Sequence, residues 1–186
     1  MTCARNGGVP TPELLIRPAL AADVEAVTAL VQGAYRGETS RAGWTTEADL
    51  LDGQRIDVDE VAAKVGHDGT EVLVAVTPGG AVVACCEIER RPASAYFGMF
   101  AVDPRQQSSG IGRRVLDAAE ARAVELWSVA AMEMTVIEQR AELIAWYERR
   151  GYRLTGERRP FPYGDLSKGL PLRPDLAFVV LSKTLG

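Results

Sequence analysis

The residues best suited to chemistry lie in a short polar segment, residues 103–112, which contains Gly110 and Gly112. The segment follows the apolar run Tyr96–Val102 and precedes apolar residues at helical spacing, so it predicts a strand, a turn and the start of a helix. The first N–H groups of a helix lack internal partners and carry a partial positive charge, which favours a bound phosphate. The two glycines lack a Cβ and let an anion approach the backbone closely.

Other kinds of site fit the chain less well. A dinucleotide-binding turn needs a third glycine where Val115 stands, and a P-loop needs a Gly-Lys-Ser/Thr sequence that the chain lacks. His67 is the only histidine, and its position between Gly66 and Asp68 predicts a turn. This argues against a histidine-rich metal site and against a Ser-His-Asp triad, so we expect no metal.

Composition and charge narrow the class of protein. The 186 residues suffice for one domain with a substantial core, and 47% hydrophobic with 25% charged residues is typical of a globular protein. The net charge of -4 and the lack of a long Lys/Arg run argue against a nucleic-acid partner. No apolar run predicts a signal peptide or a membrane span. Adjacent Cys85 and Cys86 point to opposite faces of a strand and pair poorly, which favours a reducing, cytoplasmic location.

Periodicity and turn signals predict the order of the elements. Residues 1–12 are expected to form a flexible segment and residues 13–186 a single domain. Strands are predicted at 14–18, 71–76, 81–89, 95–102, 132–136, 152–157 and 176–181, and helices at 23–35, 57–65, 111–126 and 140–150, with a further short helix starting at Thr45. A long Gly/Pro-rich loop is expected at Arg158–Pro174. The pattern is that of an α/β (α+β) domain with a single mixed, mostly antiparallel sheet flanked by helices.

Two motifs carry a resemblance to a known family. The first is Gln107-x-x-Gly110-x-Gly112, and the second is Ala145-Trp-Tyr147 followed by Gly151-Tyr152. In this order they resemble the GCN5-related N-acetyltransferase (GNAT) superfamily, whose fold has the same order of elements. The resemblance implies that the chain binds acetyl-coenzyme A in the cleft between the third meander strand and the strand that follows.

The resemblance also assigns the residues that bind coenzyme A. Backbone N–H groups from Gln107 to Gly112 would hold the pyrophosphate, and the main chain of the preceding strand would bond the pantetheine arm. A bulge in that strand, eased by Gly98, is expected. The cofactor-binding residues implied are Met99, Phe100, Ala101, Val102, Gln107, Ser108, Ser109, Gly110, Ile111, Gly112 and Arg113.

Tyr147 is the catalytic residue that the resemblance implies. Its hydroxyl would protonate the coenzyme A thiolate as it departs, because a nearby O–H stabilises the sulfur anion. A tyrosine that only packs on an amphipathic helix is the alternative, and the sequence leaves it open. Family members commonly carry an asparagine seven residues earlier, where this chain has Arg140, so an asparagine contact to coenzyme A is in doubt.

The acceptor amine needs a base and a pocket. The family often uses a carboxylate from the central strands, and Glu87 and Glu89 lie on one face of a predicted strand, so either is a candidate base. A solvated face is the alternative for both. The residues expected to contact the acceptor come from the early helical region and the late loop: Trp44, Glu47, Arg55, Phe161 and Tyr163.

Together these features predict an N-acetyltransferase that moves an acetyl group from acetyl-coenzyme A to a primary amine of a small molecule by direct attack. Two alternatives stay open: a non-catalytic acyl-coenzyme A-binding or sensor module, and an acetyltransferase that acts on a protein N-terminus or lysine. Family members are frequently dimers, so a homodimer is compatible with the resemblance, although no stretch of the sequence indicates a dimer surface.

Overall fold

The fold is built on one seven-stranded sheet, seen in a computed structural model that describes residues 13–165 and 169–186. The predicted flexible segment 1–12 lies outside the described residues. The strands are β1 (Leu15–Pro18), β2 (Leu51–Asp52), β3 (Thr70–Val76), β4 (Val82–Arg90), β5 (Ala95–Val102), β6 (Ala131–Ile137), β7 (Arg153–Pro160), β8 (Leu170–Pro171) and β9 (Ala177–Thr184). The helices are α1 (Val24–Tyr35), α2 (Gly37–Ser40), α3 (Val58–Lys64), α4 (Ile111–Trp127) and α5 (Ala141–Glu148).

The strands follow the order β1-β3-β4-β5-β6-β9-β7, and β2 and β8 pair separately as a small second sheet. Every neighbouring pair in the large sheet is antiparallel except β5 and β6, which are parallel. The predicted mixed, mostly antiparallel sheet is therefore confirmed, and the β2–β8 pair is an addition that two-residue strands do not signal in a sequence.

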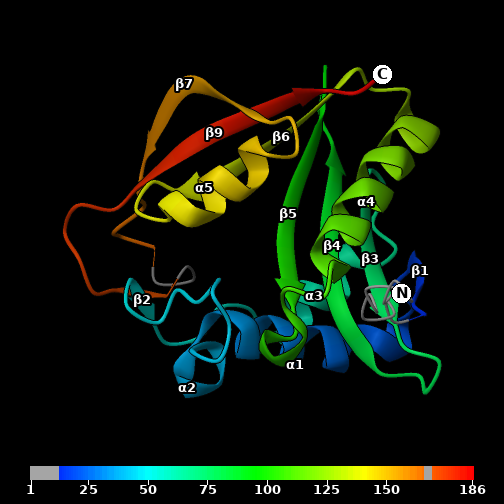
Figure 1. The fold of residues 1–186 in the computed structure, drawn as a ribbon, viewed down its shortest axis with the longest axis horizontal. Helices are drawn as coiled ribbons and strands as arrows, with labels where there is room; N and C mark the ends of the chain where they lie inside the picture. Colours follow the sequence, from blue (N-terminus) through cyan, green and yellow to red (C-terminus); the bar gives the residue numbers. More distant parts are fainter. Residues whose placement is uncertain (1–12, 166–168) are drawn as a thin grey trace, which may run out of the picture.

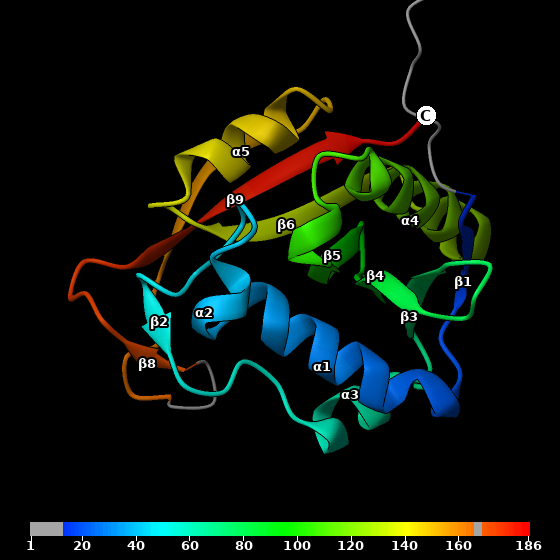
Figure 2. The same cartoon turned by 60° about the horizontal axis from the view of Figure 1, so that its bottom comes forward.

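Helices cover both faces of this sheet. Figure 2 shows α1 and α3 on one side and α4 and α5 on the other. Alternate residues of a strand point to opposite faces, so Leu73 and Ala75 of β3 join the core under α4, whereas Val72 and Val74 pack under α1. The two cores account for the near-continuous apolar character of β3 and β4.

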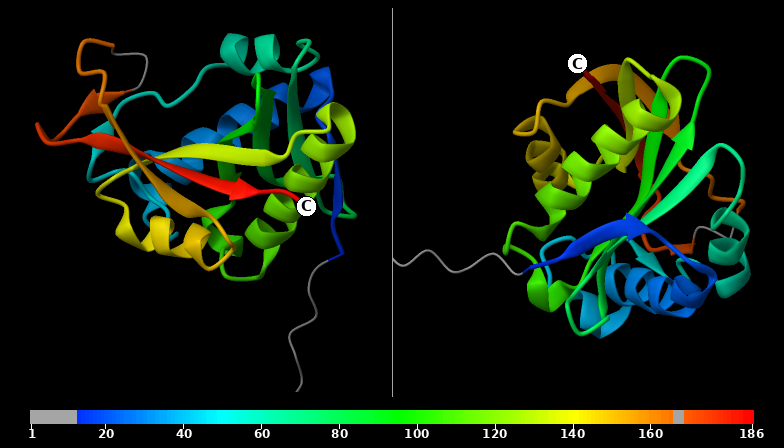
Figure 3. Two further views of the ribbon diagram at one scale, coloured as in Figure 1. Left: turned by 90° about the horizontal axis from the view of Figure 1, so that it is seen from above. Right: turned by 90° about the vertical axis from the view of Figure 1, so that its right-hand side faces the viewer.

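The sheet opens between β5 and β6. These strands pair only at Ala95 with Met132 and at Tyr96 with Glu133. Beyond that point β6, β9 and β7 run obliquely away from β5 (Figure 1), and both views in Figure 3 show the yellow-to-red strands turned away from the green ones. The gap lies where the sequence predicted the cleft.

A bulge in β5 accompanies the opening. The register of β4 and β5 shifts between Cys85 and Glu87, and Met99 takes a left-handed φ of 44°. The sequence analysis expected Gly98 to ease this distortion. In the structure Gly98 leaves room for the Tyr96 ring, because a Cβ there would lie 2.8 Å from that ring. A non-glycine residue in the left-handed region costs on the order of 1–3 kcal/mol, so the surrounding packing must hold Met99 in place.

Two local predictions are wrong. The helix expected from Thr45 does not form; the four-residue α2 precedes that position, and turns follow. The Glu47 N–H donates to the Tyr35 carbonyl at 3.2 Å, a tertiary contact that replaces a helical bond. The late loop starts at Phe161, because β7 continues to Pro160 opposite Ala177 of β9.

The remaining expectations concern cysteines and membranes. Cys85 and Cys86 are buried free thiols, and burial raises the pKa of Cys85 to about 12, so its thiolate is scarce at neutral pH. None of the helices in the described part of the chain is both long and apolar enough to cross a membrane.

Candidate active site between the split strands

Two cavities adjoin in the gap between β5 and β6. The first has a volume of about 550 Å³ and lies between β5, the start of α4 and α5. The second has a volume of about 300 Å³ and lies between β5, β6 and the segment that holds Glu47 and Arg55. The residues that border both cavities are Tyr35, Phe100, Arg140, Leu143 and Tyr147. The two cavities therefore meet at these residues.

The glycine-bearing turn forms one end of the first cavity. Asp103 caps a short 3-10 turn by accepting a hydrogen bond from the Arg105 N–H at 3.0 Å. Ser108 and Gly110 then take positive φ angles of 71° and 84°, and Gly110 is the N-cap of α4. Alternation into the left-handed region lets successive N–H groups face one side, as in backbone sites for anions. Gln107, Ser108 and Gly110 all border the cavity.

The Gln107 side chain connects separate segments through hydrogen bonds. Its Oε1 accepts from the Trp44 N–H at 2.9 Å, and its Nε2 donates to Thr45 Oγ1 at 2.8 Å and to the Val102 carbonyl at 3.3 Å. These bonds connect the glycine-bearing turn and β5 to residues 44–45. Gly43 makes room for it, because a Cβ there would lie 2.7 Å from Gln107 Oε1.

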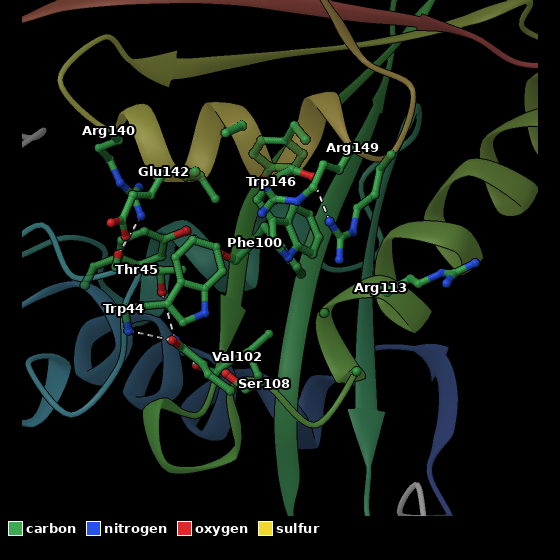
Figure 4. Close-up of a pocket in the computed structure, with 18 residues that line it drawn as sticks. Trp44, Thr45, Phe100, Val102, Ser108, Arg113, Arg140, Glu142, Trp146 and Arg149 are labelled. Atoms are coloured by element: carbon green, nitrogen blue, oxygen red, sulfur yellow. Dashed lines mark hydrogen bonds between the residues drawn. The ribbon is translucent and has the colours of Figure 1, made fainter. Parts of the chain in front are cut away.

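Aromatic rings line the first cavity. Trp44 and Trp146 face one another in Figure 4, with ring centroids 6.4 Å apart, and Phe100 lies 5.9 Å from Trp146. A Cβ on Gly112 would come within 3.3 Å of the Phe100 ring, so this glycine allows close packing of α4 on β5. Trp44, predicted to touch the acceptor, instead borders the first cavity only.

Three arginines gather at the border of the first cavity. Arg113 comes from α4, and Arg149 and Arg150 follow α5 (Figure 4). Burial first, and then the guanidinium groups of Arg149 and Arg113, lower the pKa of Arg150 from its ordinary value. Like charges held this close favour a bound anion.

Tyr147 lies where the two cavities meet. The side chain is 4% exposed, and its ring packs edge-on against Phe97, Trp146 and Tyr152. None of the hydrogen bonds found among residues 13–165 and 169–186 uses its hydroxyl. Burial raises the pKa of Tyr147 well above its ordinary value, and nearby Tyr35 adds to the shift. The group is therefore a protonated donor at neutral pH.

A buried ion-pair network supports the second cavity. Glu47 Oε2 accepts from Arg36 at 2.7 Å, Glu47 Oε1 accepts from Arg140 at 2.7 Å, and Arg140 also donates to the Thr45 carbonyl at 2.5 Å. Burial acts to raise the pKa of Glu47, but the guanidinium groups of Arg140, Arg55 and Arg36 outweigh it and hold this pKa below its ordinary value. The carboxylate stays ionised.

The structure separates the predicted cofactor residues into groups. Phe100, Val102, Gln107, Ser108, Gly110, Gly112 and Arg113 border the first cavity, and Met99 borders the second. The others border neither: Ala101 is buried in the core under α1, Ile111 is the first residue of α4 and is buried in the core between that helix and the sheet, and the Ser109 hydroxyl donates to the Gln106 carbonyl at 2.6 Å.

The two candidate bases on β4 lie elsewhere. Glu87 is buried and pairs with Lys64 of α3 at 2.7 Å, while Glu89 is partly exposed and pairs with Arg91 at 2.9 Å. Neither borders a cavity. Glu87 lies on the face that α3 covers, and the structure does not bring either carboxylate together with Tyr147 at the border of the two cavities.

The late loop contributes different residues from those predicted. Phe161 is 4% exposed and stacks on Phe178 with centroids 5.4 Å apart, and the Tyr163 hydroxyl bonds within the loop. Pro162 of the loop borders the second cavity, and so does Phe178, which belongs to β9. Glu47 and Arg55, the other two residues predicted to contact an acceptor together with Trp44, do border this cavity.

Sequence reasoning missed Tyr35 and underrated Arg140. Tyr35 ends the apolar stripe of α1, and its spacing does not distinguish it from a core residue. In the structure its hydroxyl donates to the Phe100 carbonyl in the bulge. Arg140 stood out only as a departure from the family motif, and its partner, Glu47, lies 93 residues away along the chain.

Comparison with known proteins adds a family match. A family model described as an acetyltransferase (GNAT) domain matches residues 45–162, more than half of the chain. Comparison of the sequence with curated proteins gives no match.

Solved structures share the fold. A putative acetyltransferase, yncA, from Salmonella typhimurium with its cofactor acetyl-CoA has a TM-score of 0.69 at 21% identity, over 94% of this chain and 95% of that one. The ribosomal-protein-S18-alanine N-acetyltransferase from Escherichia coli has a TM-score of 0.68 at 17% identity, over 94% and 95%. A putative phosphinothricin N-acetyltransferase has a TM-score of 0.67 at 20% identity, over 94% and 99%.

The ion-pair network predicts how stability depends on pH. Because the folded pKa of Glu47 is below its unfolded value near 4.5, its contribution is present above that pH and is lost as pH falls through the folded pKa. Glu47→Gln removes the carboxylate that two buried guanidinium groups share and should lower the free energy of unfolding at pH 7 by about 3–5 kcal/mol. Urea denaturation followed by circular dichroism should show that the difference in free energy of unfolding between wild type and this variant decreases below about pH 4.5.

Glu157→Gln is the matched control, because it removes an exposed carboxylate that also pairs with an arginine, Arg159. Its free energy of unfolding should equal that of wild type both at pH 7 and below about pH 4.5. A Glu47→Gln protein as stable as wild type at pH 7 would contradict the role given to the network.

Proposed function

Because this chain belongs to the GNAT family of acetyltransferases, we propose that it transfers the acetyl group of acetyl-coenzyme A to a primary amine of a small molecule. One observation carries the proposal: the protonated Tyr147 hydroxyl lies where two cavities of different character meet. The first cavity suits the acetyl donor and the second suits the amine.

The first cavity has the features that acetyl-coenzyme A requires. The N-terminus of α4, capped by Gly110, lies at this cavity, and Arg113, Arg149 and Arg150 border it. Their positive charge is complementary to the phosphates of the donor. The apolar wall of Trp44, Phe100 and Trp146 suits the uncharged arm between the phosphates and the thioester. A donor bound in this direction places its thioester near Tyr147.

Transfer needs an amine and an acid. The acceptor nitrogen attacks the thioester carbonyl, the C–N bond forms, and the C–S bond breaks with its electron pair leaving on sulfur. Tyr147 supplies a proton to that sulfur, and the nitrogen releases a proton to water, which balances the step. The tyrosine regains its proton from solvent afterwards.

No group in the second cavity is suited to act as a strong base. Glu47 is the only carboxylate that borders this cavity among the described residues, and both its oxygens are engaged by arginines. Its lowered pKa makes it a weak proton acceptor. The acceptor amine must therefore lose its proton to water before it attacks.

Acetyl-coenzyme A should raise the melting temperature of the wild-type protein, because a ligand that binds only the native state stabilises it. Gly110→Val should abolish most of that shift, since the side chain would project toward the bound pyrophosphate. Gly80→Val is the matched control: Gly80 has nearly the same φ, 86° against 84°, and also has no atom near an added Cβ, but lies in the β3–β4 turn. Both variants should lose similar stability without ligand, and an equal ligand shift in both would remove the turn from the donor site.

Tyr147→Phe should lower kcat by about 100-fold or more while acetyl-coenzyme A still raises the melting temperature. The change removes the hydroxyl and keeps the ring contacts with Phe97 and Tyr152. Release of free thiol measures the rate, and Glu89→Gln, which alters a residue away from both cavities, should keep wild-type kcat. A Tyr147→Phe enzyme within twofold of wild type, with product release shown not to limit turnover, would reduce Tyr147 to a packing residue.

The pH profile should rise without a matching fall. Below the pKa of the acceptor ammonium, kcat/KM for the acceptor should increase about tenfold per pH unit, because only the neutral amine attacks. The raised pKa of Tyr147 keeps the acid protonated, so no decline is expected up to about pH 9. A fall that begins near neutral pH would show that another group supplies the proton.

A further inference from the structure

The second cavity carries an excess of positive charge. The charged residues that border it are Glu47, Arg55 and Arg140, and Arg36 lies directly behind Glu47. Arg36 and Arg140 both pair with Glu47, each at 2.7 Å. One carboxylate is therefore shared by two guanidinium groups, and Arg55 adds a third positive charge. A ligand that enters this cavity therefore meets a site with more arginine than carboxylate.

Arg55 is the arginine that remains available to a ligand. Its guanidinium lies 5.5 Å from the centre of the Tyr35 ring, and its backbone N–H is fixed by Gln32 Oε1 at 2.8 Å. Within the described ranges 13–165 and 169–186, no hydrogen bond or ion pair engages the Arg55 side chain. The side chain is partly buried, and a partly buried guanidinium with unused N–H donors gains from a bound anion.

The rest of the cavity is small, and its lining mixes polar and apolar groups. The hydroxyls of Tyr96 and Thr135, two residues that border it, bond to each other at 2.9 Å. The apolar part of the lining includes Phe97, Met134, Val136 and Phe178. A volume of about 300 Å³ corresponds to roughly ten water molecules, which is the scale of an amino acid rather than of a folded protein segment. A ligand with a single anionic group and a short apolar part would satisfy both Arg55 and these walls.

We propose that the acceptor is a small zwitterionic amine, with a carboxylate or similar oxyanion bound by Arg55 and its amino group directed to Tyr147. The proposal rests on the proposed acetyl transfer and specifies its acceptor. Arginine binds planar oxyanions through two parallel N–H donors, which fixes orientation as well as charge. Amines that carry only positive charge, such as polyamines, are expected to bind poorly because they meet Arg55 and Arg140 without an anion to offer.

The test compares acceptors that differ only in the anionic group. Leucine, methionine and phenylalanine are each assayed as the free acid, as the carboxamide and as the decarboxylated amine, beside a polyamine and the other amino acids. Thiol release gives the rate, mass spectrometry identifies the N-acetyl product, and KM is expressed per concentration of unprotonated amine, because the three forms differ in amine pKa. Wild type should favour acids over their amides by about 10- to 100-fold in kcat/KM.

Variants then assign the preference to Arg55. Arg55→Gln should remove most of the preference for the acid and leave amide kinetics within about twofold, whereas Arg55→Lys should keep part of it. Arg90→Gln is the matched control, since it removes the same charge at an exposed position that borders neither cavity. Thermal melting with acetyl-coenzyme A verifies that each variant is folded and binds the donor.

The outcomes separate the two proposals. A wild-type enzyme that acetylates amides, amines or the polyamine as well as the acids overturns the anionic acceptor and leaves acetyl transfer intact. An equal loss for acid and amide in Arg55→Gln also overturns it. A protein that binds acetyl-coenzyme A but acetylates no amine in the panel contradicts the proposed function itself.

Discussion

The opening between β5 and β6 is the constraint on which the rest of the site depends. A strand that loses its neighbour exposes backbone groups that must find other partners. In this protein side chains take that role along β5. The carbonyls of Met99, Phe100 and Val102 accept from Cys85 Sγ, the Tyr35 hydroxyl and Gln107 Nε2. The gap therefore stays open while these backbone oxygens remain bonded. Two of the side chains that bond them, Tyr35 and Gln107, also border the cavities.

Glu47 holds the two sides of this opening together. Its bonds join Arg36, which follows α1, to Arg140, which precedes α5. A buried ion pair adds little net stability, because desolvation offsets much of the attraction, so its main effect is to fix geometry. The same network decides the chemistry of the second cavity. By engaging both oxygens of Glu47 it removes a base, and it leaves Arg55 as the side chain with spare donors.

The two cavities differ in how they are encoded. Most of the first cavity comes from the continuous strand, turn and helix from β5 to α4 and from α5 opposite them, and Tyr35, Trp44 and Thr45 complete it. The second draws on the end of α1, residues 47–55, β6 and Phe178, which are far apart in the sequence. Substitutions in these separate segments can therefore change the charge and shape of the second cavity while the turn at Gly110 stays the same.

The sequence by itself determined the order of the elements, the mixed sheet, the glycine-bearing turn before α4 and the position of Tyr147 on α5, because each rests on local periodicity or a contiguous motif. It did not determine which carboxylate matters. Glu87 and Glu89 had the right spacing on β4, yet their partners are Lys64 and Arg91, and the carboxylate at the site is Glu47. Ion pairs form between segments far apart in the chain, and a single sequence carries no record of which segments meet. Only the tertiary structure decided that Arg140 binds Glu47 and that Arg55 is left facing the second cavity.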